Sequence, residues 1–126
     1  MTSRQSAPKK NLNGLSVLVV EDETIISLLL EDMLTSLGAA SVWHAAGVGQ
    51  ALASLKERRP DAVLLDVNLS GERSYPVAEE LEAAGIPFVF STGYGATGLP
   101  ERWSAKPTIQ KPFTLQALEK ALAAAL

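Results

Sequence analysis

The sequence predicts an α/β fold in which helices cover both faces of a five-stranded parallel sheet. Short apolar runs typical of buried strands alternate with stretches whose apolar residues recur at helical spacing, which is the pattern of βα units. The chain has 126 residues, of which 47% are hydrophobic, and this suits one domain with a sizeable core. We expect that domain over residues 14–126. Residues 1–13 are polar and predict a flexible tail.

Five segments have the composition of strands. The clearest are residues 16–20, 61–66 and 86–91, which are short, apolar and rich in β-branched residues or phenylalanine. Residues 41–45 and 108–110 are weaker candidates that bring the sheet to five strands.

The first helix is expected between Thr24, as its N-cap, and Gly38, where it stops. Its predicted buried stripe consists of Ile25, Leu28, Leu29, Met33 and Leu37. A second helix ends before Pro60, and a third begins near Pro76 and ends at Gly85.

The last helix has a predicted N-cap at Thr114, and Leu115, Leu118 and Leu122 are expected to face inward. Before it, the alternation of strands and helices calls for a fourth helix within residues 93–107. That segment holds three glycines and two prolines, so we expect the helix to be short or unstable.

Composition excludes several classes of function. The net charge of −3 lacks the basic character of a nucleic-acid binder. Without cysteine the chain has neither disulfides nor thiolate metal sites, and no apolar run reaches the roughly 20 residues of a membrane span. We therefore expect a cytoplasmic protein with no nucleic-acid or membrane partner.

Charged and hydroxyl side chains stand where four of the predicted strands end. Glu21 and Asp22 follow the first strand, Asp66 ends the third, Thr92 follows the fourth, and Lys111 follows the fifth. Ligands of open parallel sheets bind beyond the carboxyl ends of the strands, so we expect these side chains to converge.

Three converging carboxylates raise one another's pKa unless a cation joins them. Mg²⁺ suits this need, because it prefers oxygen ligands and keeps positions open for water or phosphate oxygens. Lys111 and Thr92 would then contact the same phosphoryl oxygens. Asp66 is the best-placed nucleophile, because it stands alone at the end of the most apolar strand.

Four segments together resemble the receiver domains of two-component response regulators: "VLVVEDE" from residue 17, "VLLDVNL" from residue 63, "FST" from residue 90 and "QKPF" from residue 110. The resemblance covers the chain from about Leu15 to its end. It implies a flavodoxin-like (CheY-like) three-layer sandwich with strand order 2-1-3-4-5.

The resemblance also implies roles for individual residues. Glu21, Asp22, Asp66 and the backbone carbonyl of Asn68 would bind Mg²⁺. Asp66 would accept the phosphoryl group, with Thr92 as the switch hydroxyl and Lys111 as the lysine of the family. In receivers the bond corresponding to Lys111–Pro112 is often cis.

A narrower resemblance is to the FATGUY subgroup of stand-alone receivers. It rests on "PFVFSTGYG" from Pro87, in which Ser91 replaces the usual alanine, and on "DVNLSGERSYPVAEEL" from Asp66. The subgroup implies a histidine kinase of the HWE or HisKA2 class as partner.

One position departs from the usual receiver. The aromatic switch residue expected three positions before the lysine is Thr108 here, which puts the usual ring movement in doubt. We expect instead that phosphorylation orders or repositions residues 93–107 through Thr92.

The predicted function is that of a phosphoacceptor signalling protein, whose only catalysis is its own phosphorylation and dephosphorylation. It would act on a downstream protein or drain phosphate from a shared kinase. Two alternatives are a phosphorylation-independent pseudo-receiver, which the intact residue set disfavours, and a haloacid-dehalogenase-type phosphatase. The phosphatase needs a second aspartate two residues after Asp66, where this chain has Asn68.

Other polar and aromatic residues have simpler interpretations. Glu23 is expected to be a solvated charge near a helix N-terminus, and His44 a structural residue. Tyr94, beside the predicted site, is either a packing residue or a partner contact. No nucleotide-binding glycine loop follows the first strand.

Overall fold

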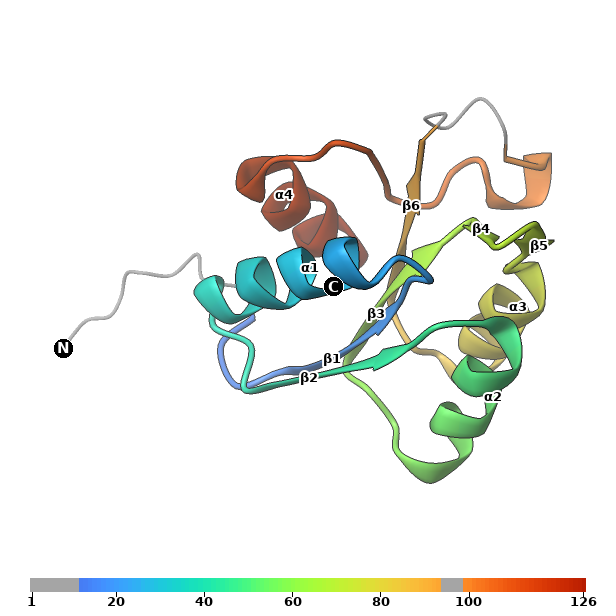
Figure 1. Cartoon of the computed structure of the whole chain (residues 1–126), viewed down its shortest axis with the longest axis horizontal. Helices are drawn as coiled ribbons and strands as arrows, with labels where there is room; N and C mark the ends of the chain where they lie inside the picture. The colour runs from blue at the N-terminus through green and yellow to red at the C-terminus, as the bar shows by residue number, and fades with distance from the viewer. Residues whose placement is uncertain (1–11, 94–98) are drawn as a thin grey trace, which may run out of the picture.

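The computed structural model describes residues 12–93 and 99–126. Its sheet has five parallel strands between two layers of helices (Figure 1). In spatial order the strands are β2 (Ser41–Ala45), β1 (Ser16–Val20), β3 (Ala62–Asp66), β6 (Phe88–Thr92) and β7 (Thr108–Gln110). With β6 and β7 counted as the fourth and fifth strands, this is the predicted order 2-1-3-4-5, and the predicted fold class is confirmed.

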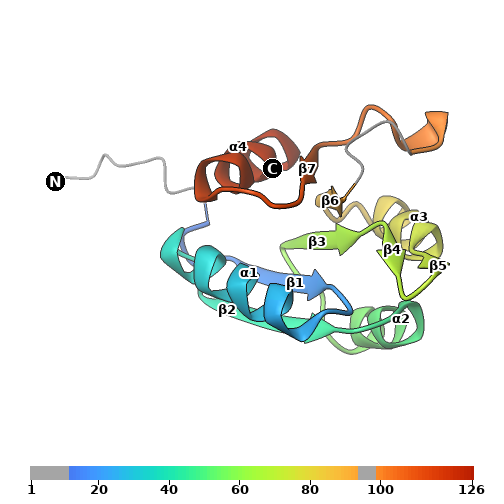
Figure 2. The same ribbon diagram turned by 45° about the horizontal axis from the view of Figure 1, so that its top comes forward.

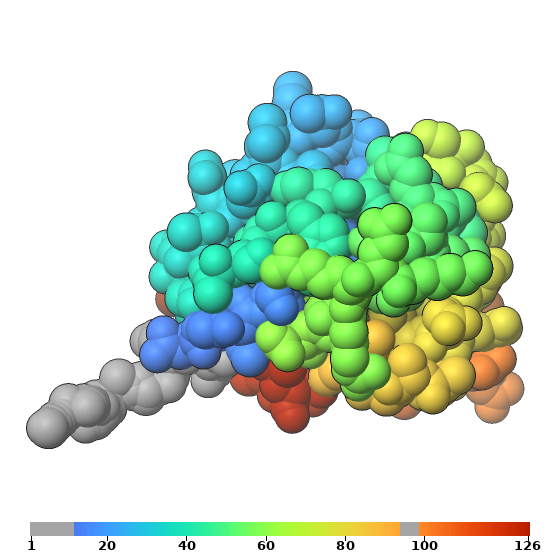
Figure 3. Space-filling model, turned by 90° about the horizontal axis from the view of Figure 1, so that it is seen from below, coloured from blue at the N-terminus to red at the C-terminus, as the bar shows by residue number. Residues whose placement is uncertain are grey.

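Two helices cover each face of the sheet. Helices α1 (Thr24–Ser36) and α4 (Leu115–Ala125) lie on one face, and α2 (Val48–Glu57) and α3 (Tyr75–Ala84) lie on the other (Figure 2). Seen from below, α2 and α3 are neighbours on the surface (Figure 3). None of the helices in the described ranges is long and apolar enough to cross a membrane.

The central strands are apolar along their whole length because both of their faces are buried. In β1, Leu18 and Val20 pack in the core beneath α2 and α3, whereas Val17 and Val19 pack in the core beneath α1 and α4. Successive side chains of a strand point to opposite faces, so a sheet covered on both sides requires apolar residues at every position.

Helix α1 confirms its predicted stripe only in part. Leu37 is buried and Met33 is partly buried in the core beneath α1 and α4, but the other three predicted residues are exposed. Ile25, Leu28 and Leu29 are 82%, 56% and 48% exposed. The buried positions of the helix are Ser27, Leu30 and Leu34. The predicted N-cap was also wrong, because Glu23 is the N-cap residue and no side chain caps the helix.

The burial of Ser27 is explained by a polar connection between α1 and the edge strand β2. Ser27 Oγ shares a hydrogen bond with Nδ1 of His44, and Nε2 of the same ring lies 2.8 Å from Glu31 Oε1. A buried hydroxyl costs little once it is hydrogen-bonded. His44 thus joins two residues of α1 from a position on β2.

The N-terminus of the last helix, α4, agrees with the prediction. Thr114 Oγ1 accepts a hydrogen bond of 3.0 Å from the backbone N–H of Ala117, as an N-cap should. Leu118 and Leu122 are buried, but Leu115 is exposed, contrary to the expectation for that residue.

The glycine- and proline-rich segment contains one short helix in its described part, the 3₁₀ helix η3 (Glu101–Trp103). Trp103 is buried against the edges of Phe88 and Phe90, with ring centroids 6.2 and 6.0 Å apart. Arg102 and Lys106 form ion pairs with Glu82 of α3. Residues 94–98, and with them Tyr94 and part of the predicted switch segment, lie outside the described residues.

Ordered packing starts before the predicted domain boundary. Leu12 is fully buried in the core beneath α1 and α4, and the backbone N–H of Gly14 donates to the carbonyl of Gly38. Leu12, which lies two residues before the predicted boundary, therefore belongs to the packed core. The rest of the predicted tail, residues 1–11, lies outside the described residues.

A short antiparallel hairpin after β3 was not predicted from the sequence. It consists of β4 (Asn68–Leu69) and β5 (Glu72–Arg73). Ser70 and Gly71 form the turn, with φ angles of 55° and 88°. Positive φ at both central residues matches the turn that best joins twisted antiparallel strands.

Ser74, at the N-terminus of α3, offers a test of this packing. The residue is completely buried, and its Oγ has no hydrogen-bond partner among the described residues. Because an unpaired buried hydroxyl costs free energy, we expect Ser74→Ala to leave the free energy of unfolding unchanged or to raise it by up to about 1 kcal/mol.

Urea unfolding measures this difference, and Thr114→Ala is the matched control. The control removes a hydroxyl that does cap a helix, so it should lower the free energy of unfolding by about 1 kcal/mol. A comparable loss for Ser74→Ala would show that its hydroxyl has a partner.

Candidate functional site

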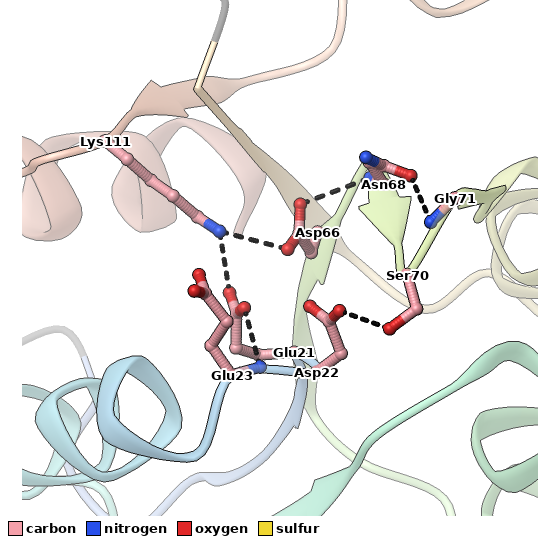
Figure 4. A network of polar contacts seen from close by, with 8 residues as sticks. All are labelled: Glu21, Asp22, Glu23, Asp66, Asn68, Ser70, Gly71 and Lys111. Carbon is pink, nitrogen blue, oxygen red and sulfur yellow. Dashed lines mark hydrogen bonds and ion pairs between the residues drawn. The ribbon is translucent and has the colours of Figure 1, made fainter.

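The polar site lies at the carboxyl edge of the sheet. Glu21 and Asp22 follow β1, Asp66 is the last residue of β3, Thr92 is the last of β6, and Lys111 follows β7. Figure 4 shows the three acids and the lysine pointing toward one another from these separate segments. The parallel register that aligns the strand ends brings together residues that are as many as 90 positions apart in the chain (111 − 21).

The three carboxylates form a compact group of oxygen ligands. One oxygen from each of Glu21, Asp22 and Asp66 lies within 4.8 Å of the others. Glu21 and Asp66 are buried, at 3% and 4% exposure, and Asp22 is half-buried. Clustered acids of this kind, all offering oxygen, match the preference of a hard divalent cation such as Mg²⁺.

Lys111 partly balances this negative charge. Its Nζ donates a hydrogen bond of 3.0 Å to Asp66 Oδ2 and lies 3.0 Å from Glu21 Oε1. Burial disfavours the ammonium, but the two carboxylates outweigh this effect and raise the pKa of Lys111. The Lys111–Pro112 peptide bond that follows is cis.

Glu21 is the least satisfied of the acids. Its Oε2 accepts from the backbone N–H of Glu23 at 3.2 Å, whereas its buried Oε1 pairs with Lys111 only as an ion and accepts no aligned hydrogen bond from the described residues. Burial raises the pKa of Glu21 to about 7, opposed by its contact with Lys111 and assisted by the charge of Asp66. A buried carboxylate beside two other acids fits a cation ligand.

Asp22 has a different environment. Ser70 Oγ donates a hydrogen bond of 2.6 Å to Asp22 Oδ2, and this bond holds the pKa of Asp22 below its ordinary value. Asn68 is the first residue of the hairpin, and its backbone N–H donates to Asp66 Oδ1 at 3.2 Å.

An open cavity of about 360 Å³ adjoins these groups. Asp66, Asn68, Thr92 and Lys111, all predicted from the sequence, line it. Ser70 and Arg73 line it as well, and sequence reasoning missed both. The signal that could have found Ser70 is the Ser70-Gly71 pair, a common turn dipeptide directly after the predicted site strand.

A profile of the response regulator receiver domain matches residues 17–123, which include every residue of the site. The chain belongs to this family.

Two solved structures resemble this chain in sequence and in fold. The solution structure of SdrG from Sphingomonas melonis Fr1 is 45% identical, with a TM-score of 0.80 over 89% of this chain and 96% of that one. The receiver domain of the sensor histidine kinase PA1611 from Pseudomonas aeruginosa PAO1, which has a magnesium ion coordinated in its active site cleft, is 28% identical, with a TM-score of 0.74 over 89% and 97% of the two chains.

A curated relative is longer than this receiver. The transcriptional regulatory protein PdtaR of Mycobacterium tuberculosis (strain CDC 1551 / Oshkosh) is 33% identical over 111 residues, which are 84% of this chain and 54% of that protein. The chain therefore spans about half the length of this relative.

The raised pKa of Glu21 predicts the pH dependence of stability of the metal-free receiver. The folded protein keeps the Glu21 proton up to about pH 7, whereas the unfolded chain loses it near 4.5. The folded state therefore binds more protons in this interval, and stability falls as pH rises through it. With allowance for solvent screening, we expect Glu21 to account for a loss of roughly 2 kcal/mol.

Urea unfolding in a chelator between pH 4.5 and 8 measures this contribution as the difference between the wild type and Glu21→Gln, whose side chain does not titrate. The variant should lose less stability than the wild type as pH rises. Parallel curves for the two proteins would contradict the assignment of this titration to Glu21.

Proposed function

We propose that this receiver accepts a phosphoryl group on Asp66 from a histidine kinase in an Mg²⁺-dependent reaction and signals through contacts with another protein. The observation that supports this most directly is the arrangement around Asp66. Its carboxylate lies beside two further acids and the ammonium of Lys111, at the edge of an open cavity.

Glu21, Asp22 and Asp66, with the backbone carbonyl of Asn68, are the proposed Mg²⁺ ligands. When bound, the ion supplies positive charge that offsets the acids and the phosphoryl oxygens. The all-oxygen donor set fits such an ion. The magnesium ion in the similar receiver of PA1611 supports the same assignment.

Asp66 acts as the nucleophile. One of its oxygens attacks the phosphorus of a phosphohistidine, an O–P bond forms, and the N–P bond breaks with its electron pair left on the imidazole of the kinase. Lys111 moves from Asp66 toward the new phosphoryl oxygens, and Thr92 donates a hydrogen bond to them. The open face of the cavity gives the phosphohistidine access to Asp66.

The partners follow from the sequence resemblance. The segment "PFVFSTGYG" supports membership in the FATGUY subgroup and a kinase of the HWE or HisKA2 class. We place the reaction in the cytoplasm, with either a downstream signalling protein or a shared kinase drained of phosphate as the outcome. Neither nucleic acid nor membrane takes part.

Phosphorylation by a small donor tests the proposal. The protein is incubated with acetyl phosphate and Mg²⁺, and its intact mass is followed for the wild type, Asp66→Asn and Asp32→Asn. Asp32 is an exposed acid of α1 and does not line the cavity. We expect the mass of one phosphoryl group on the wild type and on Asp32→Asn, and none on Asp66→Asn.

Labelling of Asp66→Asn would overturn the assignment of the acceptor. A wild type that stays unlabelled by acetyl phosphate and also fails to bind beryllofluoride would favour the phosphorylation-independent pseudo-receiver. A chelator provides the second arm, since labelling of the wild type should cease when Mg²⁺ is removed.

A further inference from the structure

The turn of the β4–β5 hairpin carries an unusual backbone conformation. Ser70 has a φ of 55° and is the one residue other than glycine with positive φ in the described ranges 12–93 and 99–126. A side chain in this left-handed region is strained, and such residues persist where the surroundings hold them and often mark functional sites. Glycine would adopt the same conformation without strain.

This conformation places the Ser70 hydroxyl against a site acid. Ser70 Oγ donates to Asp22 Oδ2 at 2.6 Å, although the two residues are 48 positions apart in the chain. The bond fixes the orientation of the Asp22 carboxylate, which lies beside Glu21 and Asp66. Figure 4 shows the hydroxyl reaching Asp22 from the hairpin.

The same turn is tied to Asp66. Gly71 N–H donates to Asn68 Oδ1 at 3.0 Å, and Asn68 N–H donates to Asp66 Oδ1 at 3.2 Å. The hairpin therefore contacts two of the three acids through separate hydrogen bonds. Because hydrogen bonds to ligand carboxylates fix the geometry of a metal site, a rigid turn would hold Asp22 and Asp66 at a set separation.

We propose that Ser70 is a positioning residue whose hydroxyl orients Asp22 for a divalent cation, at the cost of strain in the turn. This inference rests on the proposed Mg²⁺ site but concerns a residue outside the ligand set. Two properties of the protein should depend on different features of residue 70. The affinity for Mg²⁺ depends on the hydroxyl, whereas the stability of the metal-free protein depends on how well the residue tolerates positive φ.

Substitutions of Ser70 separate these properties. Ser70→Ala and Ser70→Gly both remove the hydroxyl, so we expect both to weaken Mg²⁺ binding about 10-fold, the usual scale for loss of a partner that supports a metal ligand. Their stabilities should differ, because glycine relieves the strained φ and alanine does not. Ser70→Thr keeps the hydroxyl on a side chain that tolerates positive φ poorly, so it should retain Mg²⁺ affinity and lose stability.

Titration calorimetry with MgCl₂ at pH 8 measures affinity, and urea unfolding in a chelator measures stability. Ser104→Ala is the matched control, because Ser104 is exposed and its hydroxyl donates to Glu101 O, away from the cavity. The control should bind Mg²⁺ as the wild type does.

Each outcome bears on one of the two proposals. Mg²⁺ affinity of Ser70→Gly equal to that of the wild type, or affinity that follows stability across the three variants, would show that Ser70 only shapes the turn. The proposed function would survive that result. Absence of Mg²⁺ binding by the wild type would overturn the metal site and the role of Ser70 together.

Discussion

Lys111→Ala is expected to slow phosphorylation of Asp66 by acetyl phosphate about 100- to 1000-fold, the usual effect of removing one group that stabilises charge in a transition state. The Lys111 ammonium lies 3.0 Å from both Asp66 Oδ2 and Glu21 Oε1, so it is the nearest described cation to the proposed acceptor oxygen. Its removal leaves Glu21 and Asp66 without the ammonium that pairs with them. Mg²⁺ should therefore bind the variant at least as tightly as the wild type, because the cation no longer competes with an ammonium.

Rates come from intact mass against time at saturating Mg²⁺, and affinity from calorimetry. Lys120→Ala is the control, since Lys120 is exposed on α4 and does not line the site cavity. Lys111→Ala should have a reduced rate of phosphorylation but should retain its affinity for Mg²⁺. A phosphorylation rate within a few-fold of the wild type would remove Lys111 from the proposed chemistry.

Phe90→Ala is expected to lower the free energy of unfolding by about 3–5 kcal/mol, a large share of the 5–15 kcal/mol typical of a domain. Phe90 is completely buried in β6. Its ring makes edge contacts with Phe88, Trp103 and Tyr75 at centroid distances of 5.4, 6.0 and 6.4 Å. Alanine would leave a cavity beneath α3 and η3 that these rings cannot fill.

Urea unfolding followed by tryptophan fluorescence measures the loss, and Phe113→Ala provides the comparison. Phe113 is only partly buried, at the edge of the other core, so the same change should cost about 1 to 2 kcal/mol there. Equal losses of unfolding free energy for the two variants would contradict the central place of Phe90 among the rings of Phe88, Trp103 and Tyr75.

Strands were predicted more reliably than helix faces. The apolar runs at β1 and β3 have one interpretation, because only a strand covered on both faces needs four or five apolar residues in succession. Helix α1 is apolar at most positions of its first two turns, so periodicity did not fix which side was buried. The burial of Ser27 depends on His44, a residue of another element, and no local pattern could indicate it.

Some residues of the site could likewise be located from the sequence, and others could not. Residues at strand ends could be predicted, because parallel pairing aligns those ends whatever the loops do. The hairpin could not, since strands of two residues leave no periodicity to detect. Ser70 and Arg73 reach the cavity through this hairpin, and their place depends on a turn with positive φ that serine rarely adopts.

The connection from β2 to α1 has a spectroscopic consequence. His44 is the one histidine of the 126-residue chain, so the imidazole region of its proton–carbon NMR spectrum should contain a single unambiguous resonance pair. Both ring nitrogens contact α1, one at Ser27 and the other at Glu31. The chemical shifts of these nitrogens therefore indicate whether the helix remains packed against the edge strand. The nitrogen chemical shifts of His44 therefore report on the contact between α1 and β2 beside the acidic site. They can be followed during a titration with magnesium or beryllofluoride.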